Sequence, residues 1–231
     1  MGRSVVRAGA ARCPRCSLPP RLCVCDLLPT VQARLSVHVL IHRHEQCKPS
    51  STGSLIARTV AGATCHVYQR VSRSISATGL RADALDSGRP LWILHPCGEP
   101  LTAAARSADD APAAVPQVLL LDGTWRQAGE MLRSVEGRGA CVSLPDAGKS
   151  ASRYWLRDQA GPSQVSTAEA LMSVLTAMGE PEAARCLRLH FELHVYAMLL
   201  ARGKRDMAER YLGHSPLLCE APESLARLHA G

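Results

Sequence analysis

Four cysteines gather within thirteen residues near the start of the chain, as Cys13-Pro-Arg-Cys16 and Cys23-Val-Cys25. Thiolates at this spacing can converge on one tetrahedral ion, and sites with four cysteine ligands are closed and structural. The metal would supply folding energy to a segment too short to have a core of its own. We therefore predict a zinc site at these four cysteines, with free or redox-active thiols as the alternatives.

A second chemical signal is the segment Leu119-Leu-Leu-Asp122-Gly-Thr-Trp125, where an apolar strand runs into a helix start. Ligands of open α/β sheets bind beyond the carboxyl ends of the strands, so we expect Asp122 to face a ligand crevice. Gly123 permits a close backbone approach there. The alternative is an ordinary Asx turn that feeds a helix cap, with Trp125 packed in the core.

Other polar groups follow other strand-like runs. His42-Arg-His-Glu45 comes after the first run, and Ser51-Thr-Gly53 precedes the next helix. Leu94-His95-Pro96 ends the third run. Tyr154-Trp-Leu-Arg157 combines aromatic faces with a cation, which suits base stacking and phosphate binding and suits plain packing almost as well.

These residues need a scaffold, and the chain alternates short apolar runs with helix-like stretches. This alternation predicts an α/β fold with a mainly parallel sheet. Capping boxes at Ser166–Glu169 and Thr124–Gln127 predict two of the helix starts. The predicted strands are Leu35–His42, Cys65–Val71, Leu91–His95, Gln117–Leu121 and Ala140–Leu144. The predicted helices are Ser54–Ala63, Trp125–Val135, Thr167–Met178, Pro181–Arg202 and Lys204–Leu212.

The 231 residues suffice for one α/β domain with a small appendage. We expect a disordered leader over 1–12, the zinc module over 13–30, a catalytic domain over 31–215 and a tail over 216–231. Thr102–Pro116 is rich in Ala, Asp and Pro and is expected to be a surface loop. No run approaches the roughly 18 apolar residues of a membrane span. Without an apolar signal core, the chain is expected to be cytoplasmic, with no membrane partner.

The net charge is +7, and the cationic side chains are almost all Arg. Arg binds phosphates bidentately and stacks on bases, which favours a polyanionic partner. Arg usage set by genome composition is the alternative interpretation. No DNA partner is expected, and the sequence makes no prediction of the oligomeric state.

Taken in order, these segments resemble a known family. The cysteine opening is followed by His42-x2-Glu45…Thr52-Gly53, Asp122-Gly-Thr-Trp125, Tyr154-Trp-Leu-Arg157 and Ser166-Thr-Ala-Glu-Ala170. The set is similar to the DTW domain, which is named for its Asp-x-Thr-Trp motif, and it spans residues 13–200. The chain departs from the family pattern at Arg43, where relatives usually have Pro, and at Ser51, where they usually have Asn.

The resemblance implies a tRNA-uridine aminocarboxypropyltransferase with a SPOUT-like fold and a knotted cofactor site in its C-terminal half. S-adenosylmethionine would donate its 3-amino-3-carboxypropyl group to N3 of a uridine, in the tRNA variable loop of bacterial relatives. Methylthioadenosine would be released. A SPOUT-type RNA methyltransferase and a non-enzymatic, zinc-containing RNA adaptor are the alternatives.

The resemblance also suggests roles for individual residues. Asp122 is the candidate base for the uridine N3–H, or the group that orients the uracil edge, with Thr124 and Trp125 beside it. An unperturbed Asp, with a pKa of ~3.9, needs burial to match that proton. The expected cofactor contacts are His95, Pro96, Gly98, Leu121, Asp122, Leu144, Ser166 and Thr167. The expected substrate contacts are His42, Glu45, Lys48, Thr52, Arg126, Arg153, Tyr154 and Arg157. The expected metal ligands are Cys13, Cys16, Cys23 and Cys25.

Overall fold

The computed structural model describes residues 11–70, 77, 78, 80, 85, 88–101, 115–144, 151–157 and 165–230. Residues 1–10 of the expected leader and residues 102–114 of the expected surface loop lie outside the described residues.

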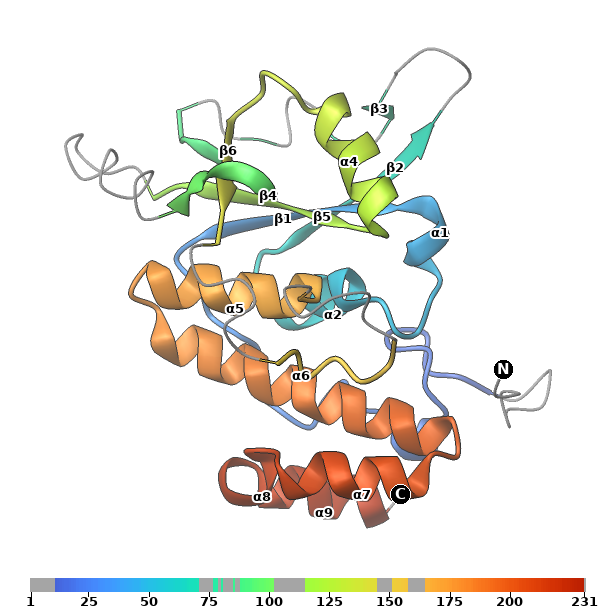
Figure 1. Ribbon diagram of the computed structural model, residues 1–231. Helices are drawn as coiled ribbons and strands as arrows, with labels where there is room; N and C mark the ends of the chain where they lie inside the picture. Colours follow the sequence, from blue (N-terminus) through green and yellow to red (C-terminus); the bar gives the residue numbers. More distant parts are fainter. Residues whose placement is uncertain are drawn as a thin grey trace.

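A sheet with five parallel strands forms the centre of the molecule (Figure 1). The strand order is β3-β2-β1-β5-β4-β6, and only β3 runs antiparallel to its neighbour. The predicted α/β fold with a mainly parallel sheet is therefore confirmed. The strands are β1 (Ser36–His42), β2 (Thr64–Arg70), β3 (Ala77–Thr78), β4 (Leu91–Pro100), β5 (Gln117–Asp122) and β6 (Ala140–Ser143).

Helices cover both faces of this sheet (Figure 1). Helix α4 (Trp125–Ser134) covers one face, and α2 (Thr52–Thr59) and α5 (Thr167–Ala177) cover the other. Helix α6 (Pro181–Ala201) packs behind α2 and α5, on the side away from the sheet. None of the helices in the described part of the chain is long and apolar enough to cross a bilayer. The remaining helices are η1 (Pro20–Leu22), α1 (Arg43–Gln46), α7 (Arg205–Gly213), α8 (Leu217–Glu220) and α9 (Pro222–Ala230).

Alternating side chains divide the core between the two faces. Leu40 and Leu119 pack with Met131 of α4, whereas Val39 and Leu120 belong to the larger cluster on the other face. Each of these strand side chains is almost fully buried. Strands buried on both faces read as continuous apolar runs, which is why β1 and β5 were recognisable from sequence.

Several boundaries differ from the prediction for identifiable reasons. Helix α2 begins at Thr52 because Ser51 caps it, and it ends at Thr59 because the next residue pairs with the chain leaving the cysteine module. Strand β4 continues to Pro100 because it pairs with β6 again after a register shift. The expected tail, 216–231, contains α8 and α9, which bury three leucines against the core.

The chain that joins β6 to α5 is described only at 144, 151–157, 165 and 166. The knot and the SPOUT-like topology therefore stay predictions.

Candidate functional site

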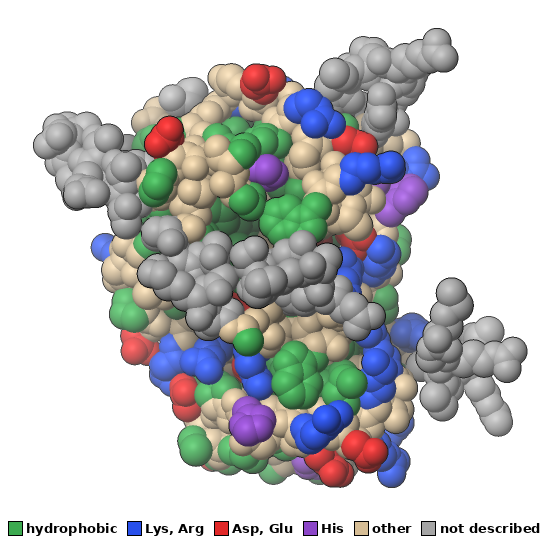
Figure 2. All heavy atoms as spheres, viewed as in Figure 1, with side chains coloured by type: hydrophobic (Ala, Val, Ile, Leu, Met, Phe, Trp, Pro, Cys, Tyr) green, Lys and Arg blue, Asp and Glu red, His purple; other side chains and the backbone are tan. Residues whose placement is uncertain are grey.

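A cavity of about 560 Å³ lies at the carboxyl ends of β5 and β6 and beside the middle of β4, between the first turns of α4 and α5. Its position is the one at which open α/β sheets bind ligands, and its volume falls within the roughly 300–1,000 Å³ of small-molecule sites. Figure 2, which has the same view as Figure 1, shows apolar side chains gathered in the upper half of this face. The cavity is lined by Leu94, His95, Pro96, Leu120, Leu121, Gly123, Trp125, Ala128, Ser143, Leu144, Val165, Ser166, Thr167 and Ala170.

Capped helix starts form two walls of the cavity. Gln127 N–H donates to Thr124 Oγ1 over 3.4 Å, and Thr124 N–H donates to Gln127 Oε1 over 2.8 Å. At α5, Ser166 and Glu169 make the corresponding pair of hydrogen bonds, of 3.3 and 2.7 Å. Both predicted capping boxes are confirmed. The positive end of a helix dipole favours negative charge nearby, so this end of the cavity suits an anionic group.

Asp122 lies directly behind the cavity wall, with 6% of its surface exposed. Its Oδ2 accepts a hydrogen bond from Ser51 Oγ over 2.9 Å, and its Oδ1 accepts one from Thr167 Oγ1 over 2.5 Å. Burial raises the pKa of this carboxyl above its ordinary value, and the hydrogen bonds from Thr167 and Ser51 oppose that shift. Since Thr167 also lines the cavity, its hydroxyl connects the carboxylate to the ligand space.

The first turn of α2 packs tightly on the same carboxylate. A Cβ atom added at Gly53 would lie 2.6 Å from Asp122 Cγ, so no other residue fits there without a shift. Asp122 therefore joins the end of β5 to the starts of α2 and α5.

Trp125 stands at the cavity and is 48% exposed. The interpretation of this residue as core packing is therefore wrong. The neighbouring Arg126 side chain is 89% exposed, and its Nε lies 3.8 Å from a carboxylate oxygen of Glu130. An accessible aromatic face and a solvent-exposed cation thus sit side by side at the start of α4.

Glu45 organises the loop that follows β1. Its carboxylate is 1% exposed and accepts hydrogen bonds from Lys48 Nζ over 2.6 Å and from Arg157 Nη2 over 2.5 Å. Although burial acts to raise the pKa of Glu45, the hydrogen bonds from Lys48 and Arg157 hold it below its ordinary value. Tyr154 O–H donates to the carbonyl of Ser50. These hydrogen bonds join the loop after β1 to the segment 151–157, although the two are far apart in the sequence.

The partners of Arg153 are groups of helices α6 and α7. Its Nε and Nη2 donate to the two carboxylate oxygens of Glu192 over 2.9 and 2.6 Å, and Nη2 also donates to the Tyr211 carbonyl over 3.0 Å. The guanidinium lies 4.0 Å from the centre of the Tyr211 ring. These contacts attach the segment that carries Tyr154 to α6 and α7.

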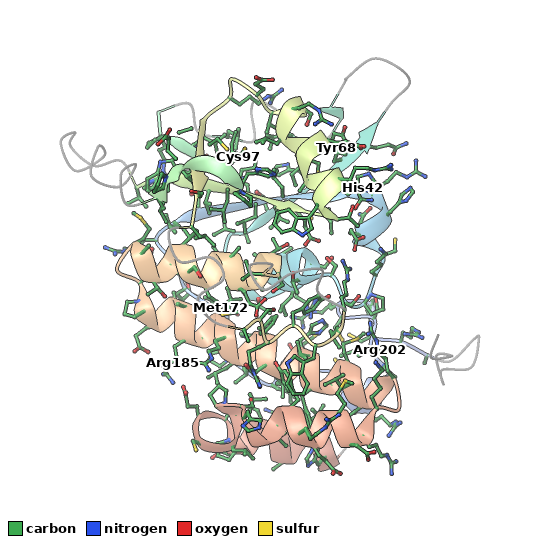
Figure 3. The ribbon with its side chains drawn as sticks, viewed as in Figure 1. His42, Tyr68, Cys97, Met172, Arg185 and Arg202 are labelled. Carbon is green, nitrogen blue, oxygen red and sulfur yellow. The ribbon has the colours of Figure 1, made fainter. Side chains whose placement is uncertain are left out.

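The remaining candidate residues divide between the cavity and its surroundings. His42 caps α1, and its ring centroid lies 5.8 Å from that of Tyr68. Both side chains are labelled in Figure 3. Thr52 is buried as the first residue of α2. Leu144 lines the cavity, whereas Gly98 is not among the lining residues and packs against the backbone of β6.

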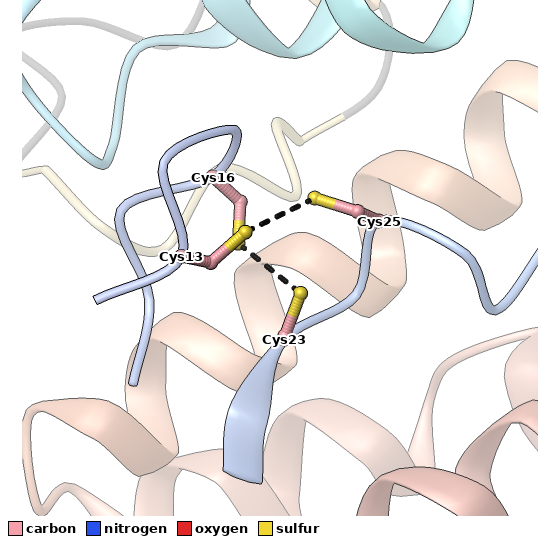
Figure 4. A group of neighbouring side chains, drawn as sticks. All are labelled: Cys13, Cys16, Cys23 and Cys25. Atoms are coloured by element: carbon pink, nitrogen blue, oxygen red, sulfur yellow. Dashed lines mark hydrogen bonds between the residues drawn. The ribbon is translucent and has the colours of Figure 1, made fainter. Parts of the chain in front are cut away.

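The four cysteines converge, as Figure 4 shows. The Sγ atoms of Cys13 and Cys25 lie 3.8 Å apart, as do those of Cys16 and Cys23, and all four lie within 4.8 Å of one another. Zn–S bonds of about 2.3 Å at tetrahedral angles place sulfur atoms roughly 3.8 Å apart, so these residues fit a zinc ion.

Sequence reasoning missed several residues of this site. Ser51, which binds Asp122, follows a strand-end loop at an N-cap position, and that signal could have identified it. Ala128 and Ala170 line the cavity from the first turns of α4 and α5, where small side chains leave room for a ligand.

Comparison with known proteins gives a family match. The family model of the DTW domain matches residues 10–199. The chain is similar to tRNA-uridine aminocarboxypropyltransferase 2 of Mus musculus, with 32% identity over 124 residues that cover 52% of this chain and 40% of the relative. The protein of the same name from Macaca fascicularis is 31% identical over 127 residues, with the same coverage. The matched part is thus less than half the length of these curated relatives. No solved structure is significantly similar to the chain.

Proposed function

Since the chain belongs to the DTW domain family, we propose that it transfers the 3-amino-3-carboxypropyl group of S-adenosylmethionine to N3 of a uridine in the tRNA variable loop. Methylthioadenosine is the second product. The observation that carries this proposal is the cavity between α4 and α5, which has Asp122 behind one wall and an exposed Trp125 at its edge.

The proposed donor site uses the cavity lining. Adenosine packs against His95, Pro96, Leu121 and Leu144, which all line the cavity. The carboxylate of the methionyl arm faces the start of α5 at Thr167, where the helix dipole favours an anion.

The proposed reaction is a displacement at the γ-carbon of that arm. The N3–C bond forms as the C–S bond breaks, and the electron pair of the C–S bond neutralises the sulfonium. Because the leaving group is already activated, positioning supplies much of the rate enhancement. The N3 proton passes to the Thr167 hydroxyl while that hydroxyl gives its own proton to Asp122 Oδ1. The hydrogen bond of 2.5 Å between these two groups and the raised pKa of Asp122 both support this route.

The proposed tRNA contacts come from the start of α4, from the loop after β1 and from the segment 151–157. Trp125 stacks on the target base, and Arg126, Lys48 and Arg157 contact phosphates. Arg153 acts indirectly, because its bonds to α6 and α7 hold the segment that carries Tyr154 and Arg157.

The proposed metal is a structural zinc ion held by Cys13, Cys16, Cys23 and Cys25. When bound, it supplies folding energy to the N-terminal module and takes no part in the transfer. The sulfur separations of 3.8 Å support this assignment.

Nucleoside analysis of tRNA incubated with the purified protein and S-adenosylmethionine tests the proposal. We expect a uridine that has gained the whole aminocarboxypropyl group, together with an equal amount of methylthioadenosine. A methylated nucleoside with S-adenosylhomocysteine would support the methyltransferase instead. No product, together with no heat of S-adenosylmethionine binding in calorimetry, would support the adaptor.

A further inference from the structure

The segment 151–157, yellow in Figure 1, packs against α6 and is joined to α5 by one side chain. Glu169, in the first turn of α5, accepts a hydrogen bond at Oε1 from the backbone N–H of Arg153 over 2.7 Å. Ser152 Oγ lies 2.9 and 2.8 Å from the two oxygens of the same carboxylate. The Oε2 atom also accepts from Ser166 N–H over 2.7 Å. One carboxylate therefore connects the segment to a helix start that forms a wall of the cavity.

The rest of this segment is fixed to other parts of the fold. Tyr154 is buried, and its O–H donates to the Ser50 carbonyl. Arg157 pairs with the buried Glu45 over 2.5 Å. The bonds of the Arg153 side chain to α6 and α7, described above, add further attachments. The segment thus offers a firm support to which α5 can be tied.

The end of α5 that is tied to this support carries a donor to Asp122. Thr167 follows Ser166 directly, and its Oγ1 donates to Asp122 Oδ1 over 2.5 Å. A shift of the helix start by about 1 Å would take the two oxygen atoms beyond the roughly 2.5–3.0 Å of such bonds. By holding Ser166, Glu169 therefore also holds the Thr167 hydroxyl on the carboxylate.

The other capping box of the chain shows what Glu169 does beyond capping. At α4 the corresponding residue is Gln127, whose single carbonyl oxygen accepts from Thr124 N–H over 2.8 Å. A capping box needs this bond and its reciprocal one, so glutamine suffices there. Glu169 instead accepts from two backbone N–H groups, one on each of its oxygens. A glutamine at this position would have an NH₂ group in place of one acceptor, so it could not make both bonds in this geometry.

We propose that Glu169 is a positioning residue for the transfer: by tying the start of α5 to the segment 151–157, it holds the Thr167 hydroxyl on Asp122. Glu169 is not among the residues that line the cavity, so it acts through Thr167 and not on the reacting atoms. Its effect on the rate rests on the proposed function, whereas its effect on the contact between Thr167 and Asp122 does not.

Initial rates of methylthioadenosine release test this role in Glu169→Gln, which keeps a residue that can cap α5. Glu182→Gln is the matched control, because it also removes a carboxylate from the first turn of a helix, at a side chain that is 82% exposed. We expect Glu169→Gln to lower kcat by about 10–100-fold, since a displacement of about 1 Å can cost roughly 10²-fold. The KM for tRNA should change little, because Glu169 makes no proposed contact with RNA. An unchanged kcat, or an equal loss in the control, would overturn the role.

A double-mutant cycle separates positioning from a general loss of stability. If Glu169 acts through Thr167, adding Glu169→Gln to Thr167→Val should slow the reaction no further, because the proton route is already broken. Two losses that simply multiply would show that the two residues act independently and would refute the proposal. If Glu169→Gln does not fold, Ser152→Ala decides the question, because it removes one donor to the same carboxylate and leaves the capping box in place. It should lower kcat by a smaller factor, and an unchanged kcat would then refute the role.

The carboxyl carbon-13 resonance of Asp122, assigned with Asp122→Asn, tests the geometry without any substrate. Burial raises the pKa of this carboxyl, and the hydrogen bonds from Thr167 and Ser51 lower it. Of the charged neighbours, Glu45 raises this pKa and Arg157 lowers it. Weakening the bond from Thr167 should therefore move the midpoint of the Asp122 titration to higher pH.

We expect that upward shift in Glu169→Gln and the midpoint of the unmodified protein in Glu182→Gln. Equal midpoints in all three proteins would overturn the positioning role. If the unmodified protein releases no methylthioadenosine from S-adenosylmethionine and tRNA, the proposed function fails. The carbon-13 titration then still decides whether Glu169 holds Thr167 on Asp122.

Discussion

Replacing Asp122 with asparagine should stop most of the transfer while the fold persists. The asparagine side chain has the same shape, so Gly53 still packs against it, but the amide cannot accept the proton that the proposed route delivers to Oδ1. Losing a proton acceptor of this kind lowers a rate by about 10²–10⁴-fold.

The loss of folding stability in Asp122→Asn should be small compared with the loss of rate. Ser51 and Thr167 each donate a hydroxyl hydrogen bond to the buried carboxylate, over 2.9 and 2.5 Å. In Asp122→Asn one hydroxyl keeps its acceptor, and the other can rotate to accept from the new amide. Two bonds to a charged group become neutral bonds, which costs about 1–3 kcal/mol of unfolding free energy.

Initial rates of methylthioadenosine release, measured beside a thermal melt, separate these effects. Thr167→Val should lose nearly as much rate as Asp122→Asn because it breaks the same proton route, whereas Ser51→Ala should lose much less. The unmodified enzyme should be faster at higher pH as the carboxyl, whose pKa is raised, loses its proton, and Asp122→Asn should lack that dependence. Full turnover in Asp122→Asn would refute the proton route and leave Asp122 as a structural tie.

Other outcomes follow from the same geometry. Trp125→Ala should barely change the melting temperature, since the ring is 48% exposed. It should weaken tRNA binding about 5–150-fold in a filter-binding assay, because one stacked base contributes roughly 1–3 kcal/mol; unchanged binding would argue against stacking. Glu45→Gln should lower the free energy of unfolding, measured in urea, by about 1–3 kcal/mol. The loss is small because both partners of Glu45, Lys48 and Arg157, reach solvent. An unchanged free energy of unfolding would mean that these ion pairs contribute nothing. Burial lowers the pKa values of His190 and His194 below 6.5. As the pH falls, these histidines therefore take up protons more readily in the unfolded chain than in the folded protein. Stability should therefore be complete above pH 6.5 and fall as the pH drops below it, and a flat urea midpoint between pH 7 and pH 5 would contradict this.

The sequence predicted those parts of the fold that depend on local patterns. Apolar runs identified β1 and β5 because both of their faces are buried, and the capping boxes at Thr124 and Ser166 identified two helix starts. The continuation of β4 to Pro100 depends on pairing with β6 across a register shift, and no local pattern encodes that.

The candidate site also divides into features that local sequence predicts and features that depend on distant parts of the chain. Strand-end position pointed to Asp122, but its burial behind Thr167 depends on α2 and α5, which lie far away in the sequence. Arg153 and Arg157 are close in the sequence and are both cations. Only the fold assigns the first to Glu192 and the second to Glu45.

Calorimetric titration of S-adenosylmethionine into the unmodified protein and into Ala170→Phe tests the central claim most directly. Ala170 lines the cavity from the first turn of α5, so a phenylalanine there would fill the proposed donor site. We predict that the unmodified protein binds S-adenosylmethionine and that the variant, with a similar melting temperature, does not. Equal affinity in the two proteins would place the donor elsewhere and contradict the account.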